Sequence, residues 1–133
     1  MTLRQDLDVP AGATWQSPTW ALLTEDGLAL PITGWTVRAQ VRRRAADETA
    51  LITFGSAGAG AVDAVADVEE VELPGPSGGG PLSTVGITLR LTAAQSALLG
   101  GLTGVYDLHV AQDDGEAYRV VEGAFRVREA VTR

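Results

Sequence analysis

Hydrophobic and polar residues alternate along several short stretches of this chain, which is the pattern of β-strands with one buried face. The clearest stretch spans residues 35–42, where the polar residues are Thr36, Arg38, Gln40 and Arg42. Side chains of a strand point alternately to its two faces. The pattern therefore predicts a strand whose core-facing side chains are Trp35, Val37, Ala39 and Val41.

Residues 85–91 alternate in the same way. We expect this stretch to bury its apolar residues Ile87, Leu89 and Leu91 and to point Thr88 and Arg90 outward.

The last thirty residues carry the strongest β signal. In residues 105–110 the apolar face holds Tyr106, Leu108 and Val110, while Asp107 and His109 face outward. The run Asp113-Asp114-Gly115 is typical of a turn, because aspartate tolerates turn geometry and glycine supplies a positive φ. Residues 118–128 return from it, with Phe125 and Val127 inward, and we interpret the whole segment as a β-hairpin followed by a third strand.

Other apolar runs predict shorter strands at residues 3–9, 15–23, 28–30, 50–54 and 68–73. Pro18 interrupts the second run, and proline lacks the N–H that a sheet ladder needs. It therefore indicates an edge strand or a bulge. Turns are expected at residues 25–27 and 31–34.

A single helix is predicted at residues 93–99. Thr92-Ala93-Ala94-Gln95 is a capping box, in which the threonine caps the helix and the glutamine reaches back to it. Gly100-Gly101 ends the helix. The glycine-rich stretch at about residues 74–81 is expected to be a flexible loop within one domain that spans residues 1–133.

Seven to eight short strands with one short helix favour an all-β fold, an immunoglobulin-like antiparallel β-sandwich. A small barrel is the alternative. The chain has no cysteine, so any likeness to immunoglobulin domains does not include their disulfide.

The formal net charge is −7, which argues against nucleic acid as a partner because phosphate binding needs a basic surface. No apolar run approaches the length of a membrane span, and the N-terminus lacks the apolar core of a signal peptide. We therefore expect a soluble protein that is made in a cytoplasm.

No set of residues predicts catalysis or a cofactor. His109 is the only histidine, and no Gly-x-Ser-x-Gly motif accompanies it, although Asp107 shares its face and could pair with it. The acidic residues of the segment 63–72 match no calcium-binding loop, so we expect a solvated acidic segment without a metal.

Trp15 and Trp20 are separated by an odd number of positions, so they would face opposite sides of a regular strand. One of them could then be exposed, which leaves a carbohydrate-binding module as an alternative function.

All ten basic residues are arginine. Outward positions on several strands predict an arginine-lined sheet face, a possible interface formed by Arg38, Arg42, Arg90, Arg126 and Arg128, with Arg119 beside them. One interpretation is a solvated face with cross-strand pairs to Asp107 and Glu122. The other is an interface with an acidic partner, such as the acidic segment of a neighbouring copy.

Three segments together resemble a known class of proteins. They are Ala11-Gly12-Ala13-Thr14-Trp15, residues 32–42, and the run from Val105-Tyr106-Asp107-Leu108 through residues 122–127 to Val131-Thr132-Arg133. Ile87-Thr88-Leu89 with the following capping box fits the same pattern. The chain resembles small structural proteins of tailed phages and prophages, and is similar to the N-terminal β-sandwich module of phage baseplate upper proteins.

This resemblance implies a non-enzymatic virion protein that docks in a tail, baseplate or neck, in symmetric copies and with other virion structural proteins as partners. A capsid decoration or head-fibre protein is the alternative location. The glycine-rich insertion and the end at Arg133, without a fibre extension, favour a small accessory or adaptor subunit.

Overall fold

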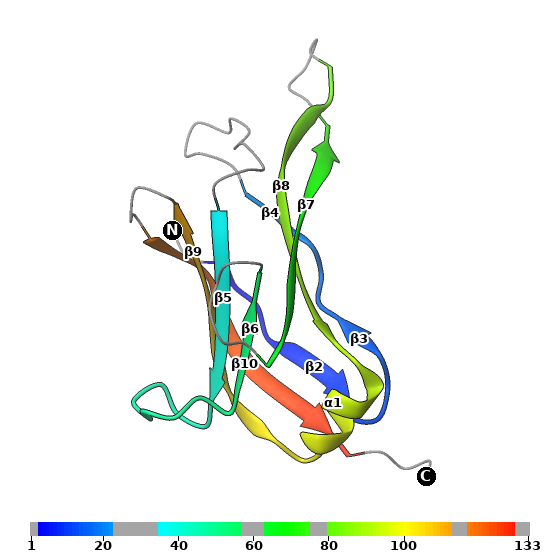
Figure 1. The fold of residues 1–133 in the computed structure, drawn as a ribbon, viewed down its shortest axis with the longest axis vertical. Coiled ribbons are helices and arrows are strands. Elements are labelled where there is room, and N and C mark those ends of the chain that lie inside the picture. Colours follow the sequence, from blue (N-terminus) through cyan, green and yellow to red (C-terminus); the bar gives the residue numbers. More distant parts are fainter. Residues whose placement is uncertain (1–2, 23–34, 57–62, 75–79, 113–116, 130–133) are drawn as a thin grey trace.

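A computed structural model describes residues 3–22, 35–56, 63–74, 80–112 and 117–129 of the chain. In these ranges the chain forms ten strands, joined in one curled sheet, and one short helix (Figure 1). The elements are β1 (Leu3–Arg4), β2 (Leu7–Pro10), β3 (Trp15–Gln16), β4 (Trp20–Ala21), β5 (Trp35–Arg42), β6 (Ile52–Gly55), β7 (Ala64–Leu73), β8 (Leu82–Leu91), α1 (Ala93–Leu98), β9 (Thr103–Gln112) and β10 (Ala117–Arg128).

The strand order is β1-β10-β9-β5-β6-β7-β8-β3, with β2 also beside β10 and β4 also beside β8. β2 and β3 follow one another in the chain, yet they pair at opposite ends of this order. A single turn at residues 11–14 therefore brings the two ends of the sheet together, which explains why the sheet curls around one core.

The β-rich fold with a single short helix is as predicted, but the sheet is mixed and not purely antiparallel. β1 and β2 run parallel to β10, and β6 runs parallel to β7 where Phe54 lies beside Ala64. The strand number is also higher than expected, because the runs 3–9 and 15–23 are each broken into two short strands.

β10 is one strand of 12 residues, so the predicted third strand of the C-terminal segment is wrong. A register shift between Arg119 and Val121 interrupts its pairing with β9 without ending it. Such a bulge inserts one residue into one strand of the ladder. Across the bulge the alternation of side chains is reversed, so two residues on either side of it can share a face that regular spacing would not give them.

The core forms where the alternation predicted it. Eleven of the predicted side chains are buried: Val37, Ala39, Val41, Ile87, Leu89, Leu91, Tyr106, Leu108, Val110, Phe125 and Val127. Trp35 is half-buried and packs against them. The ring of Phe125 lies near the middle of an aromatic group, with centroids 6.0–6.2 Å from those of Trp15, Phe54 and Tyr106.

Thr88 departs from the expected pattern. It lies on the face of β8 that should be exposed, yet only 1% of its surface is accessible. β8 is a central strand between β7 and β4. The Thr88 hydroxyl lies 2.7 Å from that of Thr19 and 3.5 Å from Oε1 of Glu69 on β7. Neighbouring side chains thus cover a threonine that alternation alone places in solvent.

α1 has the predicted capping box, in which the Thr92 hydroxyl accepts from the Gln95 N–H and the Gln95 side chain accepts from the Thr92 N–H. Buried Ser96 ties the helix to the turn after β2, because its hydroxyl donates to the carbonyl of Ala13 and accepts from the N–H of Gly12. The helix ends at Leu98, one residue earlier than expected.

Several sequence predictions fall outside the described residues. They are the turns at residues 25–27 and 31–34, the strand at 28–30, most of the glycine-rich loop, the turn at 113–115 and the last four residues.

Candidate functional site

The outer face of β5, β9 and β10 carries most of the charged side chains that the sequence singled out. Strand register places Asp107 on β9 between Gln40 on β5 and Glu122 on β10. The next row toward the C-terminal end of β9 places His109 between Arg38 and Arg119. This face is therefore a grid in which an acidic row lies beside a row of basic side chains, fixed by the pairing of three long strands.

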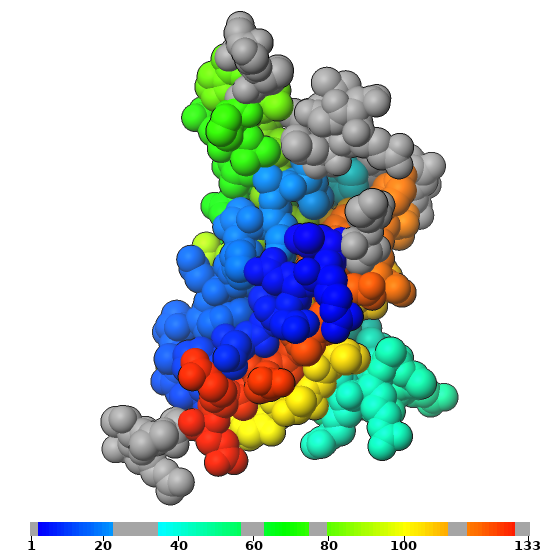
Figure 2. Space-filling view, turned by 180° about the vertical axis from the view of Figure 1, so that it is seen from behind, coloured from blue at the N-terminus to red at the C-terminus, as the bar shows by residue number. Residues whose placement is uncertain are grey.

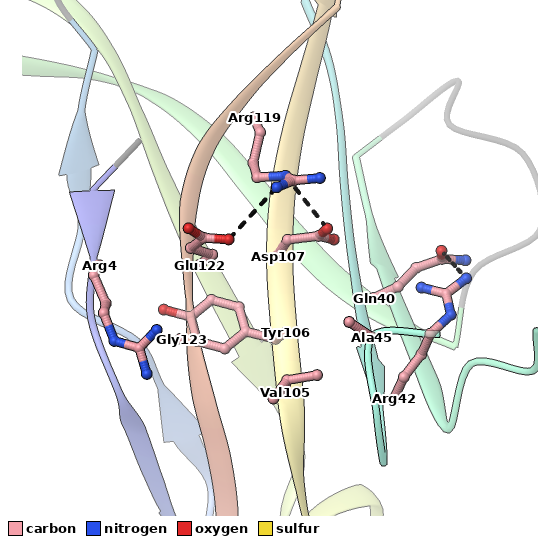
Figure 3. Close-up of a pocket in the computed structure, with 10 residues that line it drawn as sticks. All are labelled: Arg4, Gln40, Arg42, Ala45, Val105, Tyr106, Asp107, Arg119, Glu122 and Gly123. Atoms are coloured by element: carbon pink, nitrogen blue, oxygen red, sulfur yellow. Dashed lines mark hydrogen bonds and ion pairs between the residues drawn. The ribbon is translucent and has the colours of Figure 1, made fainter. Parts of the chain in front are cut away.

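Asp107 is the shared acceptor of the grid. Its Oδ2 lies 3.2 Å from His109 Nε2. The same oxygen lies 3.6 Å from Arg119 Nε, and Arg119 Nη1 lies 3.5 Å from Glu122 Oε2 (Figure 3). The predicted pairing of His109 with Asp107 is thus present. The predicted cross-strand pairs to Asp107 and Glu122 are also present, and Arg119 makes both. Ion pairs this exposed contribute about 0–1 kcal/mol each, so they order the face more than they stabilise the fold.

The bulge in β10 explains how one arginine reaches both acids. Arg119 and Glu122 are three residues apart, so a regular strand would place them on opposite faces. The register shift between Arg119 and Val121 returns Arg119 to the outer face, where it faces His109 while Glu122 faces Asp107. Bulges often redirect a side chain in this way.

A shallow hollow of about 260 Å³ lies over this grid. Three arginines and two acids supply its charge, and Figure 3 shows the Arg4 side chain on one side of Tyr106 and that of Arg42 across β9 on the other. The lining residues are Arg4, Gln40, Arg42, Ala45, Val105, Tyr106, Asp107, Arg119, Glu122 and Gly123.

The arginines of the hollow are held by different partners. Arg42 donates to Gln40 Oε1 at 2.8 Å and to the Asp47 carbonyl at 2.9 Å. Arg4 Nη2 lies 3.8 Å from Asp6 Oδ1, at the limit of an ion pair. Arg4 reaches the hollow because β1 pairs with β10, a contact that the sequence pattern gave no sign of.

Tyr106 and Gly123 also line the hollow. The Tyr106 hydroxyl donates to the carbonyl of Gln5 at 2.5 Å. Burial of the ring, and secondarily the carboxylate of Asp6, raises the pKa of Tyr106 above its ordinary value, so the phenol remains a neutral donor at physiological pH. It therefore serves as a fixed structural donor.

Four of the five predicted interface arginines share this outer face. Arg38 and Arg42 lie on β5, and Arg126 and Arg128 lie on β10, where Arg128 pairs with Asp8 at 3.3 Å. Arg90 does not join them. It lies on β8, on another part of the curled sheet, and contacts Asp67 and Gln16.

The tryptophan prediction is wrong, because neither Trp15 nor Trp20 is exposed. Trp20 is 6% accessible, and half-buried Trp15 packs on Phe125. Trp15 pairs with Leu91 and Trp20 with Ile87, so the register shifts by one residue around Pro18. The irregularity at Pro18, which the sequence predicted, turns both rings to the core. Neither tryptophan is therefore exposed for binding a sugar.

The hollow is open, and its side chains are engaged with one another or with the backbone. Among the described residues no group of three or more histidine, cysteine or acidic side chains is arranged to hold a metal ion. The described part also contains no helix long and apolar enough to cross a membrane.

No protein-family model and no curated protein matches this sequence.

Proposed function

We propose that this protein is a non-enzymatic structural subunit of a tailed-phage particle, which binds other virion subunits in the tail, baseplate or neck. The resemblance of the sequence to phage structural proteins motivates the proposal. The observation that carries it is the shape of the hairpin formed by β7 and β8, which projects from the body of the molecule (Figure 1).

β7 is ten residues long but pairs with β6 only at Ala64 and Val65. From Ala66 to Leu73 it pairs only with β8 among the described strands. On the other side of the hairpin, β4 pairs with β8 only at Gly86 and Ile87. Unpaired strand edges are ready templates for contact with another chain. A projecting hairpin with such an edge suits a subunit that acts by assembly.

We further propose that the curled sheet is an immunoglobulin-like sandwich. One layer would be β2-β10-β9-β5-β6 and the other β7-β8 with β3 and β4. Support comes from the short junction between β6 and β7, which is two residue pairs long, and from core residues contributed by both layers. In this arrangement the charged grid lies on the outer face of the first layer.

The test uses particles from the host that carries the gene. Mass spectrometry of purified particles should detect the protein in stoichiometric amounts, and immunogold electron microscopy should place it on the tail, baseplate or neck. Labelling of the head would favour the decoration alternative. Absence of the protein from purified particles would contradict the proposal.

Deletion and complementation of the gene test whether the protein is needed for particle assembly. Deleting the gene should leave incomplete particles in lysates, and the wild-type gene supplied on a plasmid should restore them. A Leu98→Ala variant, which changes an exposed side chain away from the hairpin and the grid, is the matched control and should restore assembly equally well.

A further inference from the structure

The acidic side of the projecting hairpin is one of two oppositely charged surfaces whose side chains have no ionic partner among the described residues. Glu69, Glu70 and Glu72 on β7 are exposed. Asp67, at the base of the hairpin, is neutralised by Arg90, and Glu69 has only a 3.5 Å contact to Thr88. Within the described ranges Glu70 and Glu72 form no ion pair. We call Glu69, Glu70 and Glu72 the acidic edge.

The acidic edge cannot pair with the same edge of another copy at low cost. If the β7 strands of two copies paired along their free edges, glutamates of one copy would lie beside glutamates of the other. Like charges opposite each other in a strand pair are destabilising. Charged residues on an edge strand are a recognised protection against such self-pairing. A partner for this edge must therefore carry positive charge.

The second surface carries that charge. Arg43 and Arg44 are exposed in the segment that follows β5, and Arg126 is exposed on β10. Gly104 packs against the carbonyl of Arg42, and the adjacent Thr103 pairs with Arg126, so the three arginines lie close to the same end of β9. None of the three forms an ion pair in the part of the chain that the structure describes. We call Arg43, Arg44 and Arg126 the arginine end.

The two surfaces lie at opposite ends of the molecule. Figure 1 shows the hairpin of β7 and β8 at one end of the longest axis and the segment after β5 at the other, and Figure 2 shows the same separation from behind. Complementary patches at opposite ends cannot satisfy each other within one copy. They give a head-to-tail contact between copies, which closes into a ring or continues as a filament.

We propose that the acidic edge of one copy binds the arginine end of a second copy, so that the protein associates head to tail through Glu70 and Glu72 on one side and Arg43 and Arg44 on the other. This inference rests on the proposed function only in treating the protein as an assembly subunit. Charge pairs of this kind set orientation and partner choice, and salt weakens them.

The test is sedimentation velocity of the purified full chain over a concentration series. In low-salt buffer the wild-type protein should form dimers and larger species, which dissociate as salt is raised. Glu70→Arg/Glu72→Arg and, separately, Arg43→Glu/Arg44→Glu should each weaken association by at least about tenfold, because each places like charges at the contact. The charge-preserving variants Glu70→Asp/Glu72→Asp and Arg43→Lys/Arg44→Lys should still associate.

Mixing the two charge-reversed variants gives the sharpest outcome. One retains an intact arginine end and the other an intact acidic edge, so the mixture should associate again, with equal amounts of the two variants in the complexes. A misfolded variant could not restore association, so this result also controls for folding. A wild-type protein that stays monomeric in low salt, or association that survives either reversal, would overturn the inference.

These measurements need no virus particle. A protein that associates as described but is absent from virions would contradict the proposed function alone. A virion protein that stays monomeric would contradict this inference alone.

Discussion

The hydroxyl of Tyr106 donates a hydrogen bond to the backbone carbonyl of Gln5 across 101 positions of sequence. The side chain of Gln5 in turn accepts from Trp20 Nε1 at 2.9 Å, and the next residue, Asp6, accepts from the N–H of Ala124. These hydrogen bonds hold Gln5 and Asp6, the two residues between β1 and β2, against the rest of the sheet. The N-terminal segment is therefore an integral edge of the sheet.

Removing the Tyr106 hydroxyl tests this attachment. Tyr106→Phe keeps the buried ring and leaves the Gln5 carbonyl without that donor, so we expect a loss of about 1–2 kcal/mol in the free energy of unfolding. Urea denaturation followed by tryptophan fluorescence measures the change. Hydrogen exchange should show faster exchange of the Gln5 amide than in the wild type; an unchanged stability and exchange rate would show that the bond contributes nothing.

The same hydroxyl makes the free energy of unfolding depend on pH in the alkaline range. Its pKa is raised in the folded state above the ordinary tyrosine value of about 10, because burial, and then Asp6, disfavours the phenolate. The folded state thus binds the proton more tightly than the unfolded state, so stability is unaffected below about pH 10 and falls as pH rises beyond it. Tyr106→Phe should reduce the slope of this loss in urea titrations between about pH 9 and pH 11. Equal slopes in both proteins would refute the assignment.

Gly123 makes room for the N-terminal segment. A Cβ at this position would lie 2.2 Å from the Gln5 carbonyl oxygen, and backbone cannot move aside as a flexible side chain does. Gly123→Ala should therefore cost about 1–3 kcal/mol or displace residues 3–6 from the sheet. Gly80→Ala is the matched control, since nothing lies within 4 Å of its Cβ position. Equal denaturation midpoints for the two variants would contradict this account.

Phe125 links the aromatic side chains of the core. It is fully buried, and three other rings pack around it. Phe125→Ala should lower the free energy of unfolding by about 3–5 kcal/mol through lost burial and the cavity that remains. Leu98→Ala removes a side chain that is 88% exposed, so its effect should stay within about 0.5 kcal/mol. Thermal and urea unfolding together measure both; a small effect at Phe125 would mean that the core collapses to fill the space.

Ser96 joins α1 to the turn at the edge of the sheet. Its buried hydroxyl bonds both Ala13 O and Gly12 N, so Ser96→Ala leaves two backbone groups without this partner. We expect a cost of about 1–3 kcal/mol. Thr92→Ala removes only the local helix cap and should cost about 1 kcal/mol. Comparing the two by urea denaturation separates the tertiary contact from the helix itself; a cost at Ser96 no larger than at Thr92 would contradict a tertiary role.

The amino-acid sequence by itself determined most of β5, β8 and β9 and their buried faces. Alternation identified the core side of β5, β8 and β9, and the Thr92–Gln95 capping box located the helix, because these signals depend on neighbours a few residues apart. The pairing of His109 with Asp107 followed from the same local rule.

The tertiary structure decided which strands pair and in which direction, and where the alternation slips. One-residue shifts around Pro18 and near Val120 turn Trp20 inward and Arg119 outward, against the spacing of the residues beside them. The parallel addition of β1 and β2 to β10 brings Arg4 to the hollow, and flanking strands bury Thr88. Local periodicity carries no information on these contacts, because a bulge reverses the face of every residue beyond it and strand partners far apart in sequence are selected by packing of the whole core.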